Sequence, residues 1–282
     1  MTQPSESYLR EIVLLADPVL APILAQTILL THPLATPKAL MRAAPILKVT
    51  PLSTLPALIA RCGEPLAGAR LFACATEVIV PEKLLAAFPG PSYNLHPGPP
   101  AYPGRFPAVF ALYDGAAEFG STLHEMTGKV DDGPIVAVDR FSVPPEADRA
   151  VLETQSFASV LRLLARMCGG LVRSAPLPHL PGEAWAGRKG SQADFDALCR
   201  LPEGVDAAEF ARRYRAVGEG PEHALEMTLF GHRFRLDNRR GGGVTVAGQP
   251  RPPELDGAAA ATHKGTGAAA GEDGAAAGSG KG

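Results

Sequence analysis

Cysteine is scarce in this sequence. Its 282 residues include only four cysteines, which stand far apart and form no CxxC pair: Cys62, Cys74, Cys168 and Cys199. This spacing excludes a dense disulfide framework and speaks against a cysteine-ligated zinc site. Free thiols are typical of a reducing compartment, so we predict a cytoplasmic protein without a metal centre.

An excess of positive charge is also missing. The chain has 27 Lys and Arg against 29 Asp and Glu, a formal net charge of −2. Residues 183–251 carry 11 basic against 10 acidic side chains, a balance of only +1. No bulk positive field is therefore available to hold nucleic acid or an anionic membrane.

No hydrophobic run is long enough to span a bilayer without interruption. Residues 18–37 carry no formal charge, but Pro18, Pro22, Pro33 and Pro37 interrupt them. A membrane helix needs roughly 20 consecutive apolar residues. The acidic residues near the start are also unlike the basic beginning of a signal peptide. We predict no membrane association.

Apolar residues make up 46% of the chain, which is enough for a sizeable core. In the first hundred residues, short apolar runs alternate with helix-like segments. We predict strands at 11–16, 26–32, 69–80 and 92–96 and helices at 53–62 and 81–88. Because strands that alternate with helices form parallel sheets, this half predicts an α/β fold.

The pattern changes in the middle of the chain. A helix is expected at 106–115, and two alternating runs at 120–126 and 133–143 are expected to pair as strands. A long periodic helix at 154–172 then closes a first domain, 1–175.

The remaining sequence divides into three parts. Residues 176–190 are rich in proline and predict an extended linker. Residues 191–251 predict a small α+β module, with a helix that begins at Asp206 and a hairpin about residues 230–232. Residues 252–282 contain almost no bulky apolar side chains, so we predict a disordered tail.

The stretch "PSYNLHPGPPAYPGR" at 91–105 places two polar side chains on one strand. Asn94 and His96 are two residues apart, so they project from the same face, at the strand end where open α/β sheets bind ligands. An amide N–H can hold a carbonyl oxygen, and an imidazole can donate to that oxygen or relay a proton. The pattern alone leaves open an ordinary structural pair.

A second polar cluster occurs in "GSTLHEMTGKVDDGPIV". His124 precedes Asp131 by seven residues, and Asp132 and Gly133 follow directly. A carboxylate beside His96 could orient the imidazole and accept a proton from an attacking amine. Because no GxSxG elbow occurs, the cluster favours acyl transfer without a covalent intermediate. A solvated turn is the alternative for this stretch.

Three stretches together resemble one known family. "YNLHPGPPAYPGRFPAVFALYDG", "GSTLHEMTGKVDDGPIV" and "WAGRKGSQADFD" with "YRA" resemble the folate-dependent formyltransferases in order and approximate spacing. Members carry Asn-x-His-Pro, then Gly-x-(Thr/Ser)-x-His, then an Asp seven residues beyond that histidine. In this chain Asn94, His96, Thr122, His124 and Asp131 fill those positions.

The resemblance implies a doubly wound, mostly parallel Rossmann-like sheet, N10-formyltetrahydrofolate as co-substrate and an amine as acceptor. It implies that Asn94 and His96 stabilise the formyl oxygen, while Asp131 tunes His96 and assists proton removal. The implied folate-binding residues are Val78, Ile79, Val80, Pro81, Val130, Asp132 and Gly133, and the implied acceptor-binding residues are Arg105, Thr122 and His124.

The sequence leaves the acceptor open. The family's Ser-Leu-Leu-Pro is replaced by residues 98–101, and residues 11–24 lack the usual glycine-containing turn. The module at 191–251 is short and weakly charged, which disfavours tRNA. We predict a small-molecule amine as partner, for instance an amino sugar carried on a nucleotide. The alternatives are tRNA formylation, formyltetrahydrofolate hydrolysis and a non-catalytic formyltransferase-like binding protein. A homodimer is compatible with all of them.

Overall fold

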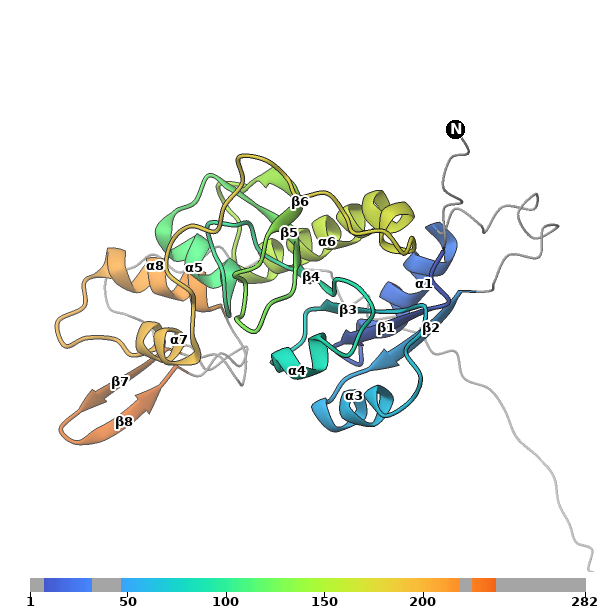
Figure 1. The fold of residues 1–282 in the computed structure, drawn as a ribbon. Coiled ribbons are helices and arrows are strands. Elements are labelled where there is room, and N and C mark those ends of the chain that lie inside the picture. The colour runs from blue at the N-terminus through green and yellow to red at the C-terminus, as the bar shows by residue number, and fades with distance from the viewer. Residues whose placement is uncertain (1–7, 32–46, 219–224, 237–282) are drawn as a thin grey trace, which may run out of the picture. The chain divides into compact units, whose positions relative to one another are not determined.

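The computed structural model describes residues 8–31, 47–218 and 225–236 (Figure 1). All of them belong to one compact unit, residues 1–243. The predicted tail lies outside the described residues, and the predicted division into domains stays a prediction. Within the described ranges, no helix is both long and apolar enough to cross a membrane.

A six-stranded sheet forms the centre of this unit (Figure 1). Its strands are β1 (Glu11–Ala16), β2 (Lys48–Leu52), β3 (Ala69–Cys74), β4 (Tyr93–His96), β5 (Glu118–Glu125) and β6 (Ile135–Ser142). Their order in space is β2-β1-β3-β4-β5-β6. The first four strands pair in parallel, whereas β5 and β6 extend the sheet in antiparallel fashion. The predicted mostly parallel α/β sheet is confirmed.

Helices cover both faces of the sheet, as in other doubly wound folds. They are α1 (Ala21–Thr31), α3 (Leu55–Cys62), α4 (Glu82–Leu85), α5 (Pro107–Asp114) and α6 (Arg149–Leu171). Ile12 and Leu14 of β1 share a core with α1 and α6, while Val13 and Leu15 share the opposite core with α3 and α4. Because both faces are covered, β1 and β3 are buried at every residue.

The strand predicted at 26–32 is wrong. Residues 26–31 belong to helix α1, and residue 32 lies outside the described residues. Pro18 precedes this helix and Pro22 occupies its first turn, where a missing N–H costs nothing. The Asp17 carboxylate prepares the start by accepting the N–H of Val19 at 2.8 Å. An apolar run without clear periodicity therefore folds as a helix that follows a turn held by Asp17.

The second strand of the sheet is instead β2, which the sequence reading missed. It contains Pro51, which cannot donate to a sheet ladder. Because β2 is the edge strand and pairs only with β1 among the described strands, the missing donor is tolerated there.

The strand predicted at 69–80 is shorter than expected. β3 ends at Cys74, and Ala75 takes a φ of 46°, in the left-handed region that residues other than glycine rarely adopt. The chain leaves the sheet at this point, and residues 75–80 form an irregular segment. The helix predicted at 81–88 is reduced to the single turn of α4, with Pro81 as its N-cap.

The middle of the chain folds as predicted. Helix α5 ends at Gly115, which takes a φ of 70° as carboxyl-terminal glycine caps do. Strands β5 and β6 pair antiparallel. The buried Arg70 of β3 then fixes the end of α6, because its guanidinium donates to four carbonyl oxygens at 2.7 to 3.2 Å. These are the carbonyls of Leu171, Arg173, Ser174 and Ala175.

Two helices and a hairpin follow in the carboxyl-terminal part: α7 (Gln192–Cys199), α8 (Ala207–Val217), β7 (Glu226–Leu229) and β8 (His232–Arg235). The predicted hairpin is confirmed, and both residues of its turn, Phe230 and Gly231, have positive φ. Asp206 caps α8 as expected. Phe210 and Tyr214 of α8 stack at 6.0 Å and pack against the core that α5 lines.

Residues 176–190 contain no helix or strand, as predicted for this segment. They nevertheless pack along the sheet. The N–H of Leu177 donates to the Tyr93 hydroxyl at 2.8 Å, and the N–H of Leu180 donates to the carbonyl of Ile135 at 2.7 Å. The segment is therefore part of the folded unit that also carries the sheet.

Candidate active site

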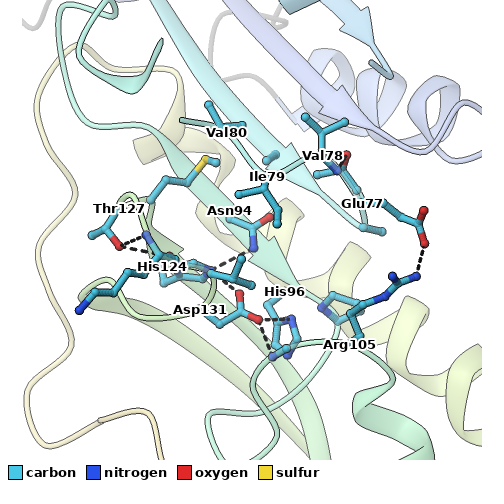
Figure 2. A pocket seen from close by; sticks show the side chains of 18 of the residues that line it. Glu77, Val78, Ile79, Val80, Asn94, His96, Arg105, His124, Thr127 and Asp131 are labelled. Atoms are coloured by element: carbon cyan, nitrogen blue, oxygen red, sulfur yellow. Dashed lines mark hydrogen bonds and ion pairs between the residues drawn. The ribbon is translucent and has the colours of Figure 1, made fainter. Parts of the chain in front are cut away.

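A cavity of about 370 Å³ lies at the carboxyl ends of β3 and β4 (Figure 2). Its lining residues come from four segments: 73 and 75–80; 94, 96 and 97; 104–107; and 124 and 126–131. These segments are far apart in sequence, but β3, β4 and β5 are neighbours in the sheet and bring them together.

Asn94 and His96 line this cavity from the end of β4. β4 pairs in parallel with β3 and antiparallel with β5, so Asn94 lies opposite Ala73 on one side and His124 on the other. Because residues two apart on a strand share a face, both side chains project toward the same space (Figure 2). The predicted cleft beside the carboxyl end of β4 is confirmed.

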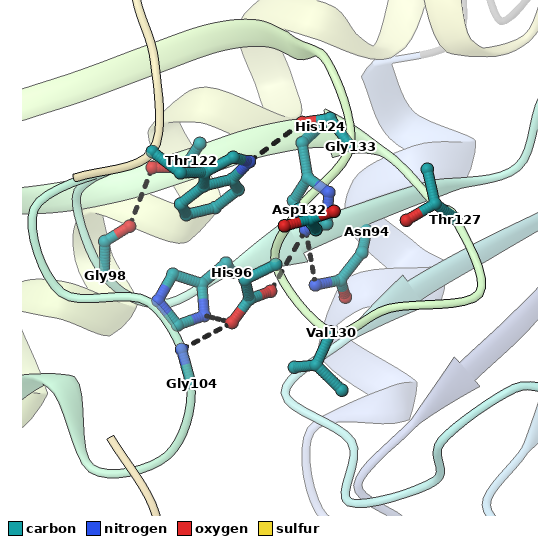
Figure 3. A network of polar contacts seen from close by, with 12 residues as sticks. Asn94, His96, Gly98, Gly104, Thr122, His124, Thr127, Val130, Asp132 and Gly133 are labelled. Atoms are coloured by element: carbon teal, nitrogen blue, oxygen red, sulfur yellow. Dashed lines mark hydrogen bonds and ion pairs between the residues drawn. The ribbon is translucent and has the colours of Figure 1, made fainter. Parts of the chain in front are cut away.

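The buried carboxylate of Asp131 lies between His96 and His124 (Figure 2). Figure 3 shows the same two rings with Asn94 and Gly104 beside them. Its Oδ1 is 3.2 Å from Nε2 of His124, and its Oδ2 is 3.4 Å from Nδ1 of His96. The backbone N–H of Gly104 donates to Oδ2 at 2.7 Å. Nε2 of His124 also lies 3.0 Å from Nδ2 of Asn94. One continuous polar network therefore joins the ends of β4 and β5 to the loop after β5.

The loop that carries Asp131 is tightly constrained. Asp131 has a φ of 42°, in the left-handed region. Two residues later, Gly133 lies against the preceding strand, where a Cβ would come within 1.9 Å of the carbonyl oxygen of Glu125. The aspartate is thus held in a backbone conformation that is uncommon for its residue type.

The network holds a carboxylate next to a neutral imidazole at neutral pH. Burial by itself raises the pKa of Asp131, but the hydrogen bond with His124, the neighbouring imidazoles and the N–H of Gly104 outweigh it and lower this pKa from 3.8 to about 2. Burial lowers the pKa of His96 below 6.5, although the Asp131 charge and the Tyr102 carbonyl act in the opposite direction.

Both ring nitrogens of His96 face hydrogen-bond acceptors. Nε2 lies 2.9 Å from the carbonyl oxygen of Tyr102, and Nδ1 faces the Asp131 carboxylate. A neutral imidazole has only one N–H and cannot donate to both. A proton taken up by the ring gains the second hydrogen bond, so His96 is arranged to accept one. Gly98 leaves room for this ring, because a Cβ there would come within 2.5 Å of Nε2.

The implied folate-binding residues divide into two groups. Val78, Ile79, Val80 and Val130 line the cavity, and Ile79 and Val130 are 66% and 44% exposed at its rim. Pro81, Asp132 and Gly133 lie outside the cavity wall. Asp132 instead reaches the surface, where it pairs with Lys129 and Lys189.

The implied acceptor-binding residues also divide. Arg105 lines the cavity and forms an ion pair with Glu77 across its rim (Figure 2). His124 belongs to the polar network described above. Thr122 lies outside the wall, because its buried hydroxyl donates to the carbonyl of Gly98 at 2.8 Å.

Sequence reasoning missed three contributors to this site. The carbonyl of Tyr102 and the N–H of Gly104 act through backbone atoms, which leave no trace in the residue type. Trp185 packs edge to face with both histidines, at 5.0 Å from His124 and 5.9 Å from His96 between ring centroids. It is the only tryptophan of the chain and lies in the stretch 176–190, which the sequence predicts to be an extended linker.

Fold and site together define a doubly wound α/β protein with a buried acid–base cluster beside a ligand-sized cavity. Residues 69–159 match the family model described as formyl transferase. This range contains Asn94, His96, His124 and Asp131. The match confirms the resemblance of the chain to the folate-dependent formyltransferase family.

Curated proteins with similar sequences are also formyltransferases. The methionyl-tRNA formyltransferase of Roseiflexus castenholzii is 28% identical over 189 residues, which cover 67% of this chain and 54% of the relative. The chain thus spans about half the length of the curated relatives it matches.

Solved structures share the fold. A 4-N formyltransferase from Francisella tularensis superposes with a TM-score of 0.60 at 17% identity, over 80% of this chain and 96% of that one. An N-formyltransferase from Helicobacter canadensis, in complex with folinic acid and dTDP-3-aminofucose, gives a TM-score of 0.54 at 14% identity, over 79% and 85% of the two chains.

Proposed function

We propose that this chain transfers a formyl group from N10-formyltetrahydrofolate to the amino group of a small molecule. The observation that carries the proposal is the Asp131 carboxylate held between two imidazoles, with Asn94 beside them, in the wall of a cavity. The formyl transferase match over the same residues supports it. So does the likeness to an N-formyltransferase in complex with folinic acid and an amino-sugar nucleotide.

The cavity wall suits a folate. Its rim presents apolar side chains from two segments, with Ile79 on one and Val130 on the other, and flat apolar rings bind favourably against such surfaces. Residues 75–80 form neither helix nor strand, so backbone N–H and C=O groups of this segment can serve a ligand. We infer that Val78, Ile79, Val80 and Val130 contact the folate ring.

Asn94 is the best-placed donor for the formyl oxygen. An amide carries two N–H groups, and among the described residues the side chain of Asn94 has His124 as its one hydrogen-bond partner. The second N–H is therefore available to a ligand in the cavity. When the amine attacks the formyl carbon, charge develops on the oxygen, and a fixed donor stabilises that charge.

His96 and Asp131 handle the proton. The new N–C bond forms as the amine attacks. The proton that the amine loses passes by way of the Asp131 carboxylate to Nδ1 of the neutral His96 ring, whose Nε2–H faces the Tyr102 carbonyl. The Asp131 charge, which faces Nδ1, stabilises the imidazolium that results. As the bond from the formyl carbon to N10 breaks, the same proton is returned to N10. His96 thus acts first as a base and then as an acid.

A covalent enzyme intermediate is not part of this proposal. Among the described residues that line the cavity there is no serine or cysteine, and the nearby Cys74 is buried with a pKa raised to about 12 by burial. Direct attack of the acceptor amine on the bound donor is therefore the simplest reaction for these residues.

Product analysis tests the proposal. The protein is incubated with N10-formyltetrahydrofolate and a metabolite extract, and the formylated products are identified by mass spectrometry. A formylated small amine is the expected product. Formate as the only product would indicate a hydrolase. If the donor keeps its formyl group, the protein is a non-catalytic binding protein.

A separate experiment tests tRNA as the acceptor, because the curated relatives are methionyl-tRNA formyltransferases. Initiator methionyl-tRNA is offered as acceptor at low and at moderate salt. Binding through several phosphates weakens steeply with salt. Efficient, salt-sensitive formylation of this tRNA would replace the small amine as the proposed acceptor.

A further inference from the structure

Residues 185–190 lie between the two loops that build the polar network, and they hold the first of these loops through the backbone. The first loop, 98–105, follows His96. Ala186 N–H donates to the carbonyl of Pro100 at 2.9 Å, and Gly190 N–H donates to the carbonyl of Pro103 at 2.8 Å. In return, the N–H of Arg105 donates to the carbonyl of Gly190 at 2.8 Å.

The same residues hold the second loop through two side chains. The indole Nε1–H of Trp185 donates to the carbonyl of Gly133 at 2.8 Å. Nζ of Lys189 donates to the carbonyl of Val130 at 2.6 Å and lies 3.3 Å from Oδ1 of Asp132. These contacts fall on both sides of Asp131.

Asp131 needs support from outside its own loop. Its left-handed backbone conformation is uncommon for a residue with a side chain, and such conformations persist only where the surroundings over-determine them. The ring of Trp185 also packs against both imidazoles that flank the carboxylate. Residues 185–190 thus contact both loops and both imidazoles while remaining outside the cavity wall.

We propose that residues 185–190 form a clamp that positions Asp131 between His96 and His124, with Trp185 and Lys189 as its positioning residues. The clamp works by fixing the carbonyls on either side of Asp131, which sets where the carboxylate points. Its catalytic consequence rests on the proposed formyl transfer, whereas its effect on the histidines does not.

The kinetic test uses Trp185→Phe, which keeps an aromatic ring but loses the indole N–H, and Lys189→Gln, which loses the cation. Arg188→Gln is the matched control, because the ion-pair partner of Arg188 is Asp194. Misplacing a reacting group by about 1 Å can cost roughly 10²-fold in rate, so we expect kcat for formyl transfer to fall by about 10-fold to 10²-fold in both clamp variants. The Arg188 control and Lys189→Arg, which restores the cation, should stay close to the unchanged protein.

A double-variant comparison separates positioning from general loosening. Residues that act as a unit are non-additive, so Trp185→Phe and Lys189→Gln should cost little more once Asp131 is already asparagine. Each clamp substitution is therefore measured in the unchanged protein and in Asp131→Asn. If it lowers kcat by the same factor in both, the clamp does not act through Asp131 and the proposal is overturned.

A second measurement needs no activity. The imidazole Cε1–H resonances of His96 and His124 are compared by NMR in the unchanged protein, Lys189→Gln and Arg188→Gln. We expect both resonances to shift in Lys189→Gln only, because Lys189 acts on them through the Asp131 loop. Unmoved resonances in Lys189→Gln would overturn the clamp. A shift together with no formyl transfer in the unchanged protein would uphold the clamp and contradict only the proposed function.

Discussion

Replacing Asp131 with asparagine keeps the shape of the side chain and removes its charge. The pKa of this carboxyl falls from 3.8 to about 2 in the folded protein, which corresponds to roughly 2 kcal/mol of preferential stabilisation of the carboxylate. Because Asp131 is only 4% exposed, solvent screens little of this. A lowered pKa contributes stability that is complete above the unfolded value and is lost as the pH falls toward about 2. At pH 7, Asp131→Asn should therefore lower the free energy of unfolding by roughly 2 kcal/mol.

Urea unfolding followed by tryptophan fluorescence measures this change, because Trp185 is the only tryptophan and lies beside both histidines. Asp132→Asn is the control. Its surface ion pairs with Lys129 and Lys189 are worth at most about 1 kcal/mol. If Asp131→Asn proves as stable as the unchanged protein, or Asp132→Asn loses as much, the electrostatic reasoning about this site is wrong.

Four further predictions concern stability and the space around His96. Phe210→Ala should lower the free energy of unfolding by about 1 to 3 kcal/mol, because it removes a half-buried ring that stacks on Tyr214. In thermal unfolding, Phe210→Leu should recover part of the lost stability. Arg70→Met should lower the free energy of unfolding, measured in urea, by about 2 to 3 kcal/mol, because four carbonyls lose their donor. No measurable loss of stability would mean that water replaces the guanidinium. Gly98→Ala should leave the far-ultraviolet circular dichroism intact but lower formyl transfer by roughly 10²-fold, because the added methyl group displaces His96. Stability should also decline as the pH falls below 6.5, since the pKa of His96 is lowered on folding and the protonated ring is disfavoured, and His96→Asn should remove this component from the pH profile of unfolding.

Much of the fold could be predicted because its signals are local. The run at 11–16 is short, apolar and closed by Asp17-Pro18, and it forms β1 with the predicted bounds. The glycine at 115 ends α5, and the turn at 230–231 closes the hairpin. In the same way, a spacing of two residues placed Asn94 and His96 on one face of a strand.

The failures arose where non-local contacts or capping decide the structure. Residues 28–30 form an apolar run too short for periodicity to separate a buried strand from a helix. The helix follows a turn that Asp17 holds and has Pro22 in its first turn, where a proline is tolerated rather than an interruption.

The parts of the site that the sequence did not predict also depend on non-local contacts. Tyr102 and Gly104 contribute backbone atoms, and Trp185 reaches the network only because residues 176–190 pack back along the sheet. Contacts between segments more than 50 residues apart leave no periodic pattern in a single sequence. The predicted carboxylate could be found from the seven-residue spacing, but the surroundings that hold it could not.

The most direct test of the central claim follows a carbon-13 formyl group from N10-formyltetrahydrofolate by NMR. It compares the unchanged protein with His96→Ala, Asp131→Asn and the double variant, each supplied with the acceptor amine found by product analysis. We expect the label to appear as a formamide with the unchanged protein, and each single variant to transfer it about 10²-fold or more slowly. The double variant should be little slower than the slower single variant, because the two residues handle one proton together. Unchanged transfer by Asp131→Asn, or a label that stays on the folate with the unchanged protein, would contradict the claim.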